Sequence, residues 1–336
     1  MGYSARLRVG LVGIGMMGRN HARVLRSLDG VQLVAVADPS GDRHQMAGEA
    51  AVVDNIEQLI AQGIDAAVVA VPTALHLDAG LALATAGVHT MIEKPLATDA
   101  AECRELVAAF EGANLINAVG HIERYNPALR ALRQRLDGGD LGDLYQVATR
   151  RQGPFPNRIA DVGVVKDLAT HDIDLTSWVI RSPYASVTAQ VAHKSGREHE
   201  DLVSVTGRMM DGTVVNHLVN WLSPLKERVT VVTGDRGAYV ADTLNGDLSF
   251  HENGVINTEW DQVATFRGVA EGNSTRFAIP KPEPLRVQHE AFRDAVLGNP
   301  SDIVTMRDGL RTVAVADACL ASALQGRTID VADERE

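Results

Sequence analysis

Cysteine and long apolar runs are scarce in this sequence, and each scarcity excludes a class of protein. Only two of the 336 residues are cysteines. Cys103 and Cys319 lie far apart and neither belongs to a CxxC pair, so no zinc or redox motif is supported and we expect no metal site. No apolar run approaches the ~20 residues of a membrane span. We also expect no secretory signal, because the apolar stretch Val9–Val12 leads directly into a glycine pattern, and therefore a cytoplasmic protein.

Basic residues are in the minority. The 32 Lys and Arg residues face 43 Asp and Glu residues, which leaves a net charge of −11. Because binding to a phosphate backbone needs a basic surface, this balance argues against nucleic acid as the main partner. It leaves an anionic small ligand open, since a few local Arg residues suffice to bind one. Hydrophobic residues make up 45% of the chain, which is enough to build globular cores.

The length and the order of apolar segments indicate two domains. Up to about residue 120, short continuous apolar runs alternate with helical segments, which is typical of the α/β class, with a parallel sheet covered on both faces. The predicted strands are Leu7–Val12, Val31–Ala37, Ile64–Val71, Val88–Ile92 and Leu115–Val119, and the predicted helices include His21–Leu28 and Leu77–Ala86. We assign residues 1–122 to a nucleotide-binding domain.

The remainder, residues 123–336, has a different pattern and is assigned to a second, β-rich domain. Several segments alternate apolar and polar side chains, as half-buried antiparallel strands do. These strands are predicted at Leu144–Arg151, Val187–Lys194, Leu202–Met210, Val214–Trp221 and Arg228–Gly234, with a hairpin turn at Met210–Thr213. Helices are predicted at Pro127–Leu136, Val164–Ile180, Leu285–Leu297 and Arg307–Leu324.

A G-x-G-x-x-G pattern stands directly after the first predicted strand and opens the first helix. It comprises Gly13, Ile14, Gly15, Met16, Met17 and Gly18. The first glycine permits a tight turn, the second lets the backbone approach a pyrophosphate, and the third lets the helix pack close to the strand. The helix N-terminus offers N–H groups to the phosphates. The pattern predicts a dinucleotide site.

Asp38 ends the second strand, and an acidic residue there accepts hydrogen bonds from the ribose hydroxyls and repels a 2′-phosphate. This favours NAD over NADP. Arg43 lies close enough in sequence to pair with a 2′-phosphate, so NADP stays open. Pro72, Thr73 and His76 follow the third predicted strand, and they lie either beside the cofactor or in an ordinary turn.

Glu93-Lys94-Pro95 follows the strand Val88–Ile92. A lysine at a strand end is usually solvated. Here the strand end faces the crevice in which the nicotinamide is expected, so Glu93 and Lys94 are predicted cofactor contacts. Lys94 is also a predicted proton relay, with Pro95 fixing the backbone beside it.

Asp167 and His171 stand four residues apart and share a helix face, with Asp174 further along the same stripe. On an ordinary surface helix such a pair is merely solvated. This helix interrupts a β-rich domain and sets ionisable groups beside Leu168 and Trp178, which suits a helix that faces a ligand. An imidazole beside a carboxylate is a sound general base for an alcohol proton.

In their order along the chain, these motifs resemble the Gfo/Idh/MocA oxidoreductase family over nearly the whole sequence. The resemblance implies an N-terminal Rossmann domain and a C-terminal α+β domain built on a large, open, mostly antiparallel sheet, whose outer face commonly joins dimers or tetramers. It also implies that Lys94, Asp167 and His171 form the catalytic group of an NAD-dependent sugar dehydrogenase. His171 takes the hydroxyl proton, Lys94 orients the hydroxyl, and Asp167 positions the substrate or the base.

Three further stretches resemble one branch of the family, the UDP-N-acetylglucosamine 3-dehydrogenases, which oxidise the 3-hydroxyl of a nucleotide-linked amino sugar. They are Gly120–Pro127, Arg150–Ile159 and Asp161–Val165. With this substrate, Arg124, Arg151 and Arg158 are placed to meet the diphosphate bidentately, although each alone is more simply explained as a surface arginine. The other expected substrate contacts are Glu123, Tyr125, Asn157, Asp167 and His171. Lys166 departs from the branch, in which an apolar residue is expected.

Two classes of alternative stay open. Within the same chemistry, inositols, free sugars and sugar phosphates are rival substrates, and the sequence does not decide between oxidation and the reverse reduction. The other class is a catalytically silent NAD-binding regulator. Such a protein has no need of a proton relay, so Lys94, Asp167 and His171 argue against it.

Overall fold

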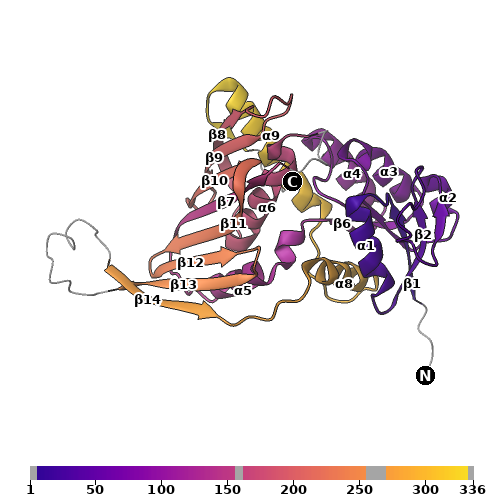
Figure 1. Ribbon diagram of the computed structural model, residues 1–336, viewed down its shortest axis with the longest axis horizontal. Coiled ribbons are helices and arrows are strands. Elements are labelled where there is room, and N and C mark those ends of the chain that lie inside the picture. Colours follow the sequence, from indigo (N-terminus) through magenta and orange to yellow (C-terminus); the bar gives the residue numbers. More distant parts are fainter. Residues whose placement is uncertain (1–5, 156–161, 255–269, 332–336) are drawn as a thin grey trace. The chain divides into compact units, whose positions relative to one another are not determined.

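The computed structural model describes residues 6–155, 162–254 and 270–331, and the chain divides into two compact units (Figure 1). The first unit runs to Ile122 and also contains Glu283–Asp317. The second unit runs from Glu123 to Pro282 and also contains residues 318–331 of the described chain. Each unit has its own sheet.

The first unit is built on a six-stranded parallel sheet in the order β3-β2-β1-β4-β5-β6. Its strands are β1 (Leu7–Val12), β2 (Val31–Ala37), β3 (Ala51–Val53), β4 (Ala66–Val69), β5 (His89–Ile92) and β6 (Asn117–Val119). Its helices are α1 (Met16–Arg26), α2 (Ile56–Ile60), the short 3-10 turn η1 (Thr73–Leu75), α3 (His76–Thr85), α4 (Ala100–Gly112), α8 (Pro284–Val296) and the start of α9 (Met306–Gln325). The strand order reverses between β1 and β4, and ligands of such sheets bind outside the carboxyl ends of the strands near that point.

Helices cover both faces of this sheet, which is why its strands are continuously apolar. Adjacent residues of β4 belong to different cores: Val68 packs in the cluster that contains Phe292 of α8, and Val69 in the cluster that contains Leu310 of α9. All four residues of β4 are buried. The predicted parallel α/β arrangement is confirmed, whereas β3 and α2 were not predicted.

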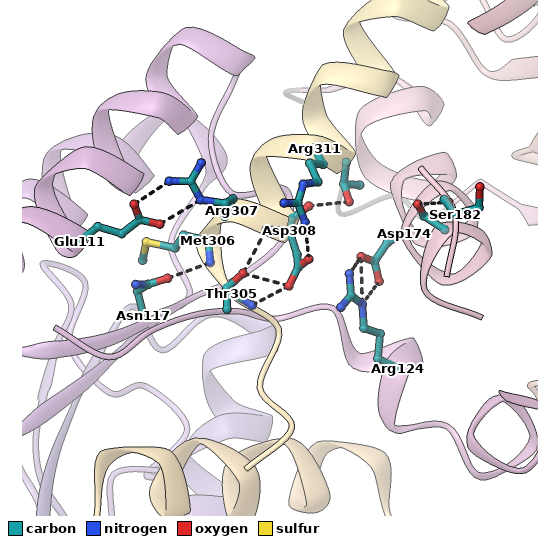
Figure 2. A network of polar contacts seen from close by, with 12 residues as sticks. Glu111, Asn117, Arg124, Asp174, Ser182, Thr305, Met306, Arg307, Asp308 and Arg311 are labelled. Atoms are coloured by element: carbon teal, nitrogen blue, oxygen red, sulfur yellow. Dashed lines mark hydrogen bonds and ion pairs between the residues drawn. The ribbon is translucent and has the colours of Figure 1, made fainter. Parts of the chain in front are cut away.

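The C-terminal helices correct the predicted domain limits. Residues 123–336 were assigned to one domain, but Glu283–Asp317 belongs to the first unit. The amide oxygen of Asn117 accepts the N–H of Met306 at 2.9 Å, and Arg307 pairs with Glu111 at 2.6 Å, so the start of α9 is tied to β6 and α4 (Figure 2). The physical reason is that α8 and α9 supply apolar side chains that both cores of the first sheet need, a requirement that no local pattern displays.

A nine-stranded sheet forms the second unit in the order β14-β13-β12-β11-β7-β10-β9-β8-β15. Its strands are β7 (Leu144–Pro154), β8 (Tyr184–Ala192), β9 (Leu202–Met209), β10 (Val214–Asn220), β11 (Leu222–Gly234), β12 (Gly237–Asp242), β13 (Asp247–Gly254), β14 (Ala270–Phe277) and β15 (Ile329–Asp330). Neighbouring strands of this sheet run antiparallel, except that β7 and β10 are parallel to each other. This confirms the mostly antiparallel sheet and the hairpin turn between β9 and β10, where Gly212 has a φ of +93°.

Helices α5 (Pro127–Asp137) and α6 (Thr170–Ile180) pack on this sheet (Figure 1). The short helix η2 (Ile122–Tyr125) precedes α5, and a π-helical turn, η3 (Val165–Ala169), leads into α6. The single helix predicted over Val164–Ile180 is therefore a π-helical turn followed by an α-helix. Turns of this kind occur frequently at functional sites.

Candidate active site

The glycine loop joins β1 to α1, and its three glycines have different surroundings. Gly13 adopts a φ of +87°, and a Cβ added there would lie 2.7 Å from the carbonyl oxygen of Ala70. A Cβ on Gly18 would overlap the carbonyl oxygen of Gly13, so α1 starts in close contact with the strand end. A Cβ on Gly15, in contrast, would meet nothing within 4 Å. The loop is open at Gly15, where α1 begins without a side-chain cap, as a phosphate-binding turn requires.

A cavity of about 460 Å³ lies beside this loop, within the first unit. Gly13, Gly15, Asp38 and Pro72 line it, together with apolar side chains such as Leu75. Two N–H groups hold the Asp38 carboxylate at the end of β2, from Ile14 at 2.9 Å and from Ser40 at 2.8 Å. The cavity has the size and mixed lining of a small-ligand site, and its position fits the adenosine half of a dinucleotide.

The charged residues on this cavity are acidic. Asp54, Glu57 and Asp78 line it along with Asp38, and no lysine or arginine stands among its lining residues in the described parts of the chain. Arg43 is exposed and is not one of the lining residues. The arrangement therefore gives no support to the expected contact between Arg43 and a cofactor.

The residues after β4 that were expected to contact the cofactor have different surroundings. Pro72 lines the cavity, but the His76 imidazole is buried between backbone carbonyl groups, 2.9 Å from Pro95 O and 3.0 Å from Val71 O. Burial lowers the pKa of His76. His76 therefore ties the loop after β4 to the loop after β5, which favours the second of the two interpretations left open for it, an ordinary turn. Thr73 is buried at the start of η1.

Lys94 follows β5 directly and is half-buried, while the Glu93 side chain is buried. Glu93 does not point to an open surface: Oε1 lies 2.8 Å from Nε2 of His21, and Oε2 accepts the backbone N–H of Lys94 at 3.2 Å. A Cβ on Gly120 would lie 2.7 Å from Oε1, so the glycine leaves room for this carboxylate. Glu93 is thus an internal partner of α1, and Lys94 is the residue of this motif that remains partly accessible.

In the second unit, Asp167 lies in the π-helical turn and His171 in the first turn of α6. Asp167 is buried, and His171 is half-buried. Arg228 of β11 is near enough for the Asp167 charge to act on it. Burial lowers the pKa of Arg228 to about 10, helped by Arg151, while surrounding carboxylates act in the opposite direction.

Arg151 has internal partners. It is 3% exposed, its Nε donates to Asp172 at 2.7 Å, and its Nη1 donates to Glu123 at 2.8 Å. Burial raises the pKa of the Asp172 carboxyl, and the adjacent guanidinium opposes that shift. The planar fork of Arg151 is therefore occupied by two carboxylates, which gives no support to the expected contact with a diphosphate.

Arg124 is likewise paired with an internal carboxylate. Its Nε and Nη2 both donate to Asp174, at distances of 2.6 to 3.1 Å, in the bidentate arrangement seen in Figure 2. Tyr125 is buried. Asn157 and Arg158, the remaining expected substrate contacts, lie outside the described residues. Asp174 is thus the partner of Arg124.

Several polar residues of these sites gave no signal in the sequence analysis. His21 and His289 contact Glu93 directly or in series, Asp172 holds Arg151, and Arg228 stands near Asp167. His21 follows the glycine loop on the face of α1 that packs on the sheet, and a polar residue at such an apolar position was the available signal. The partners of the other three are far away in sequence or on other elements.

In the described residues, no group of three or more His, Cys, Asp and Glu side chains has a metal-binding arrangement. None of the helices in the described ranges combines the length and apolar character that a bilayer span needs.

The strand order and the glycine loop define a protein with a dinucleotide-binding Rossmann unit. Two family models agree: residues 7–121 match the oxidoreductase family with an NAD-binding Rossmann fold, and residues 129–240 match the GFO/IDH/MocA C-terminal domain. The chain belongs to the Gfo/Idh/MocA oxidoreductase family.

Relatives with different substrates are similar to this chain at nearly equal identity. UDP-N-acetylglucosamine 3-dehydrogenase of Acidithiobacillus ferrooxidans is 28% identical over 92% of this chain and 95% of its own length. Inositol 2-dehydrogenase 1 of Saccharopolyspora erythraea is 29% identical over 97% and 96%. A solved structure of the Acidithiobacillus enzyme, GnnA, superimposes with a TM-score of 0.83 at 25% identity, over 95% of this chain and 98% of that one. The WlbA dehydrogenase of Bordetella pertussis, in complex with NADH and UDP-GlcNAcA, shares the fold with a TM-score of 0.84 at 22% identity, over 98% of this chain and 99% of that one.

Proposed function

We propose that this protein oxidises a secondary hydroxyl group of a sugar to a ketone, with NAD as the cofactor. The substrate we favour is UDP-N-acetylglucosamine or a related nucleotide sugar, and the hydroxyl is the one at carbon 3. The observation that carries the proposal is the presence of Lys94, Asp167 and His171, the residues that the family resemblance implies for catalysis, in a chain that is similar to such an enzyme over 92% of its length.

The chemistry divides among three side chains. His171, half-buried at the start of α6, accepts the hydroxyl proton as a general base. Lys94 donates a hydrogen bond to the reacting oxygen and so orients it, and Asp167 positions the base or the substrate. NAD, when bound, supplies the acceptor for the hydride. The substrate-derived proton leaves through the protein side chains, which is why a relay of this kind is needed.

NAD is favoured over NADP by the charge of the cavity beside the glycine loop. Asp38 is held by two N–H groups at the end of β2, and three other carboxylates line the same cavity. A 2′-phosphate brought to this surface would meet repulsion and no basic side chain among the lining residues described.

Inositol is the second candidate substrate, and two observations favour it. An inositol 2-dehydrogenase is as similar to this chain as the UDP-sugar enzyme is. In addition, Arg124 and Arg151 are engaged with carboxylates, so neither offers its fork to a diphosphate. A neutral polyol needs hydrogen-bonding groups but no cation.

One assay separates these candidates. The purified protein is incubated with NAD and, in turn, UDP-N-acetylglucosamine, myo-inositol, a free hexose and a hexose phosphate, and NADH is followed by its near-ultraviolet absorbance. We expect turnover with the UDP-sugar at least about tenfold above the others, since a tenfold preference needs only about 1.4 kcal/mol of differential binding. Good turnover of myo-inositol without turnover of the UDP-sugar would reject the favoured substrate.

Two variants test the catalytic assignment itself. Lys94→Met and His171→Asn should each lower turnover by about 100-fold or more, because general acid–base groups contribute about 10²–10⁴. NADH binding, followed by fluorescence, should stay close to that of the wild type. Unchanged turnover in both variants would contradict the assignment and leave the NAD-binding regulator as the better interpretation.

A further inference from the structure

A buried hydrogen-bonded chain runs behind Lys94. The Glu93 carboxylate contacts Nε2 of His21 at 2.8 Å, and Nδ1 of His21 contacts Nε2 of His289 at 2.8 Å. The two imidazole rings meet edge to face, with centroids 5.0 Å apart. All three side chains are buried, and all belong to the first unit.

The chain joins three elements. His21 lies on α1, the helix that begins in the glycine loop, and His289 lies on α8. Glu93 follows β5, and its second oxygen accepts the backbone N–H of Lys94 at 3.2 Å. The carboxylate therefore connects the helix at the phosphate-binding loop with the backbone that carries Lys94.

The protons of this chain can be arranged in two ways. With one proton on the His21 ring, its Nε2 donates to Glu93 and its Nδ1 accepts from Nε2–H of His289. With two protons on that ring, Nδ1 donates instead, and the proton of His289 stands on Nδ1. Both arrangements keep both hydrogen bonds. They differ by one proton, which changes the net charge of the chain from −1 to zero.

The ionisation of the end groups agrees with this scheme. Burial acts to raise the pKa of Glu93, but the hydrogen bond and charge of His21 and the charge of Lys94 outweigh it, so the pKa is lowered. Burial and the neighbouring His21 lower the pKa of His289 well below that of a free imidazole. Nδ1 of His289 has no hydrogen-bond partner among the described residues.

We propose that Glu93, His21 and His289 are positioning residues for Lys94. This hydrogen-bonded chain of three side chains holds the end of β5 against α1 and α8. Its protonation sets the charge behind Lys94 while that lysine takes part in proton transfer. The inference rests on the proposed catalytic role of Lys94. Titratable groups coupled to the chain from outside it include, among the described residues, Lys94 and His76 of α3, on which the Glu93 charge acts.

Two substitutions that remove a titratable group test the proposal. Glu93→Gln keeps an acceptor oxygen for His21 but removes the charge, and His289→Gln places an amide near the Nε2 position but cannot titrate. We expect kcat of Glu93→Gln to fall about 10- to 100-fold, as small misplacements of a reacting group do, with KM values changed less. Both variants should also shift the pH profile of kcat relative to the wild type.

The matched control is His89→Asn, at the opposite end of the same strand. Nδ1 of His89 accepts the N–H of Ile116 at 3.0 Å, and the Asn oxygen can take its place. This variant should keep the wild-type kcat and pH profile. If folded Glu93→Gln and His289→Gln also keep both, the chain is only structural and the proposal is wrong.

A spectroscopic measurement on the wild type does not depend on folding of a variant or on a substrate. In protein labelled with ¹⁵N-histidine, His21 and His289 should give imidazole nitrogen signals of hydrogen-bonded rings that change together with pH. Two rings that titrate independently would overturn the inference. Lys94→Met separates the two proposals: if it keeps full turnover, the catalytic role proposed for Lys94 fails, whereas a loss of turnover together with unaltered Glu93→Gln kinetics rejects only the positioning role of the hydrogen-bonded chain.

Discussion

At the scale of single residues, the surroundings of an ionisable group decide what it can do. Arg124 and Arg151 were expected to contact a ligand, yet each guanidinium is engaged with internal carboxylates. Arg228, which the sequence did not single out, donates from Nη1 to two backbone carbonyl groups, at 2.8 Å and 2.7 Å. The presence of an arginine at a given position therefore does not show whether it binds a ligand until the positions of the nearest carboxylates are known.

Asp38 carries a prediction at this scale. Asp38→Ser removes the carboxylate that we expect to bind the ribose hydroxyls, and a hydrogen bond to a charged group contributes about 1.5–3 kcal/mol. NADH binding should weaken by about tenfold or more, and NADPH binding should improve relative to it. Fluorescence titration of both nucleotides measures the change.

Arg43→Ala is the control for that measurement, because Arg43 is exposed and does not line the cavity. It should leave both affinities unchanged. A loss of NADPH binding in Arg43→Ala, with no change in Asp38→Ser, would reverse the roles that we give these two residues.

At the scale of elements, different glycines of the turn from β1 into α1 serve folding and cofactor binding. Gly15→Ala adds a methyl group to open space, whereas Gly18→Ala drives one into the carbonyl oxygen of Gly13. Gly15→Ala should keep the wild-type unfolding temperature and lose NADH affinity, because the methyl group stands where the phosphates approach. Gly18→Ala should lose stability by about 1–3 kcal/mol. Thermal unfolding and fluorescence titration together detect both effects, and an unstable Gly15→Ala protein would contradict the geometry.

Strand β10 contributes a buried imidazole that makes stability depend on pH. His217 lies 2.8 Å from the Thr149 hydroxyl and 2.7 Å from the Tyr184 hydroxyl, and burial lowers its pKa from 6.5 to about 4. Between pH 6.5 and about pH 4, the His217 imidazole is therefore protonated in the unfolded chain but neutral in the folded protein. The free energy of unfolding should fall as the pH drops through this range, by up to about 1.4 kcal/mol per pH unit.

His217→Gln tests this linkage. The variant should be less stable at neutral pH, because it loses a hydrogen bond, but its stability should fall less steeply on acidification. Denaturant unfolding at a series of pH values gives the slope for each protein. Parallel slopes would show that His217 does not titrate between the folded and unfolded states.

At the scale of the whole molecule, the nine-stranded sheet has a face whose alternate residues are exposed, as the pattern along β9 shows. Val214 and Leu218 of β10 are 36% and 38% exposed on it. We propose that this face joins copies of the chain, since apolar side chains on an open sheet mark contact surfaces. Leu218→Glu should lower the oligomeric mass measured by light scattering.

Leu324→Glu is the control for the oligomer, because Leu324 is 88% exposed but lies on α9 rather than on the sheet. It should leave the mass unchanged. A wild-type protein that is monomeric at all concentrations would reject the proposed surface.

Local patterns predicted much of the fold. Continuous apolar runs located the long strands of the first sheet, and alternation located β7 to β10, because burial on one face or two has a fixed period along the chain. The short strand β3 and the strands β12 to β14 lacked such a signal. The candidate residues were predicted less evenly: the glycine loop and Asp38 have local chemistry, whereas the arginines depend on distant partners.

By itself, the sequence determined the α/β class, the glycine loop and the position of Lys94 after a strand, because each follows from residues that are neighbours along the chain. The tertiary structure alone decided which ionisable groups are internal and where the C-terminal helices belong. Contacts of this kind join residues as far apart as His21 and His289, 268 positions along the chain. A contact between residues so far apart produces no recognisable periodicity or spacing in the sequence. The reason is that a suitable side chain at any position that folding brings to the same place can form the contact.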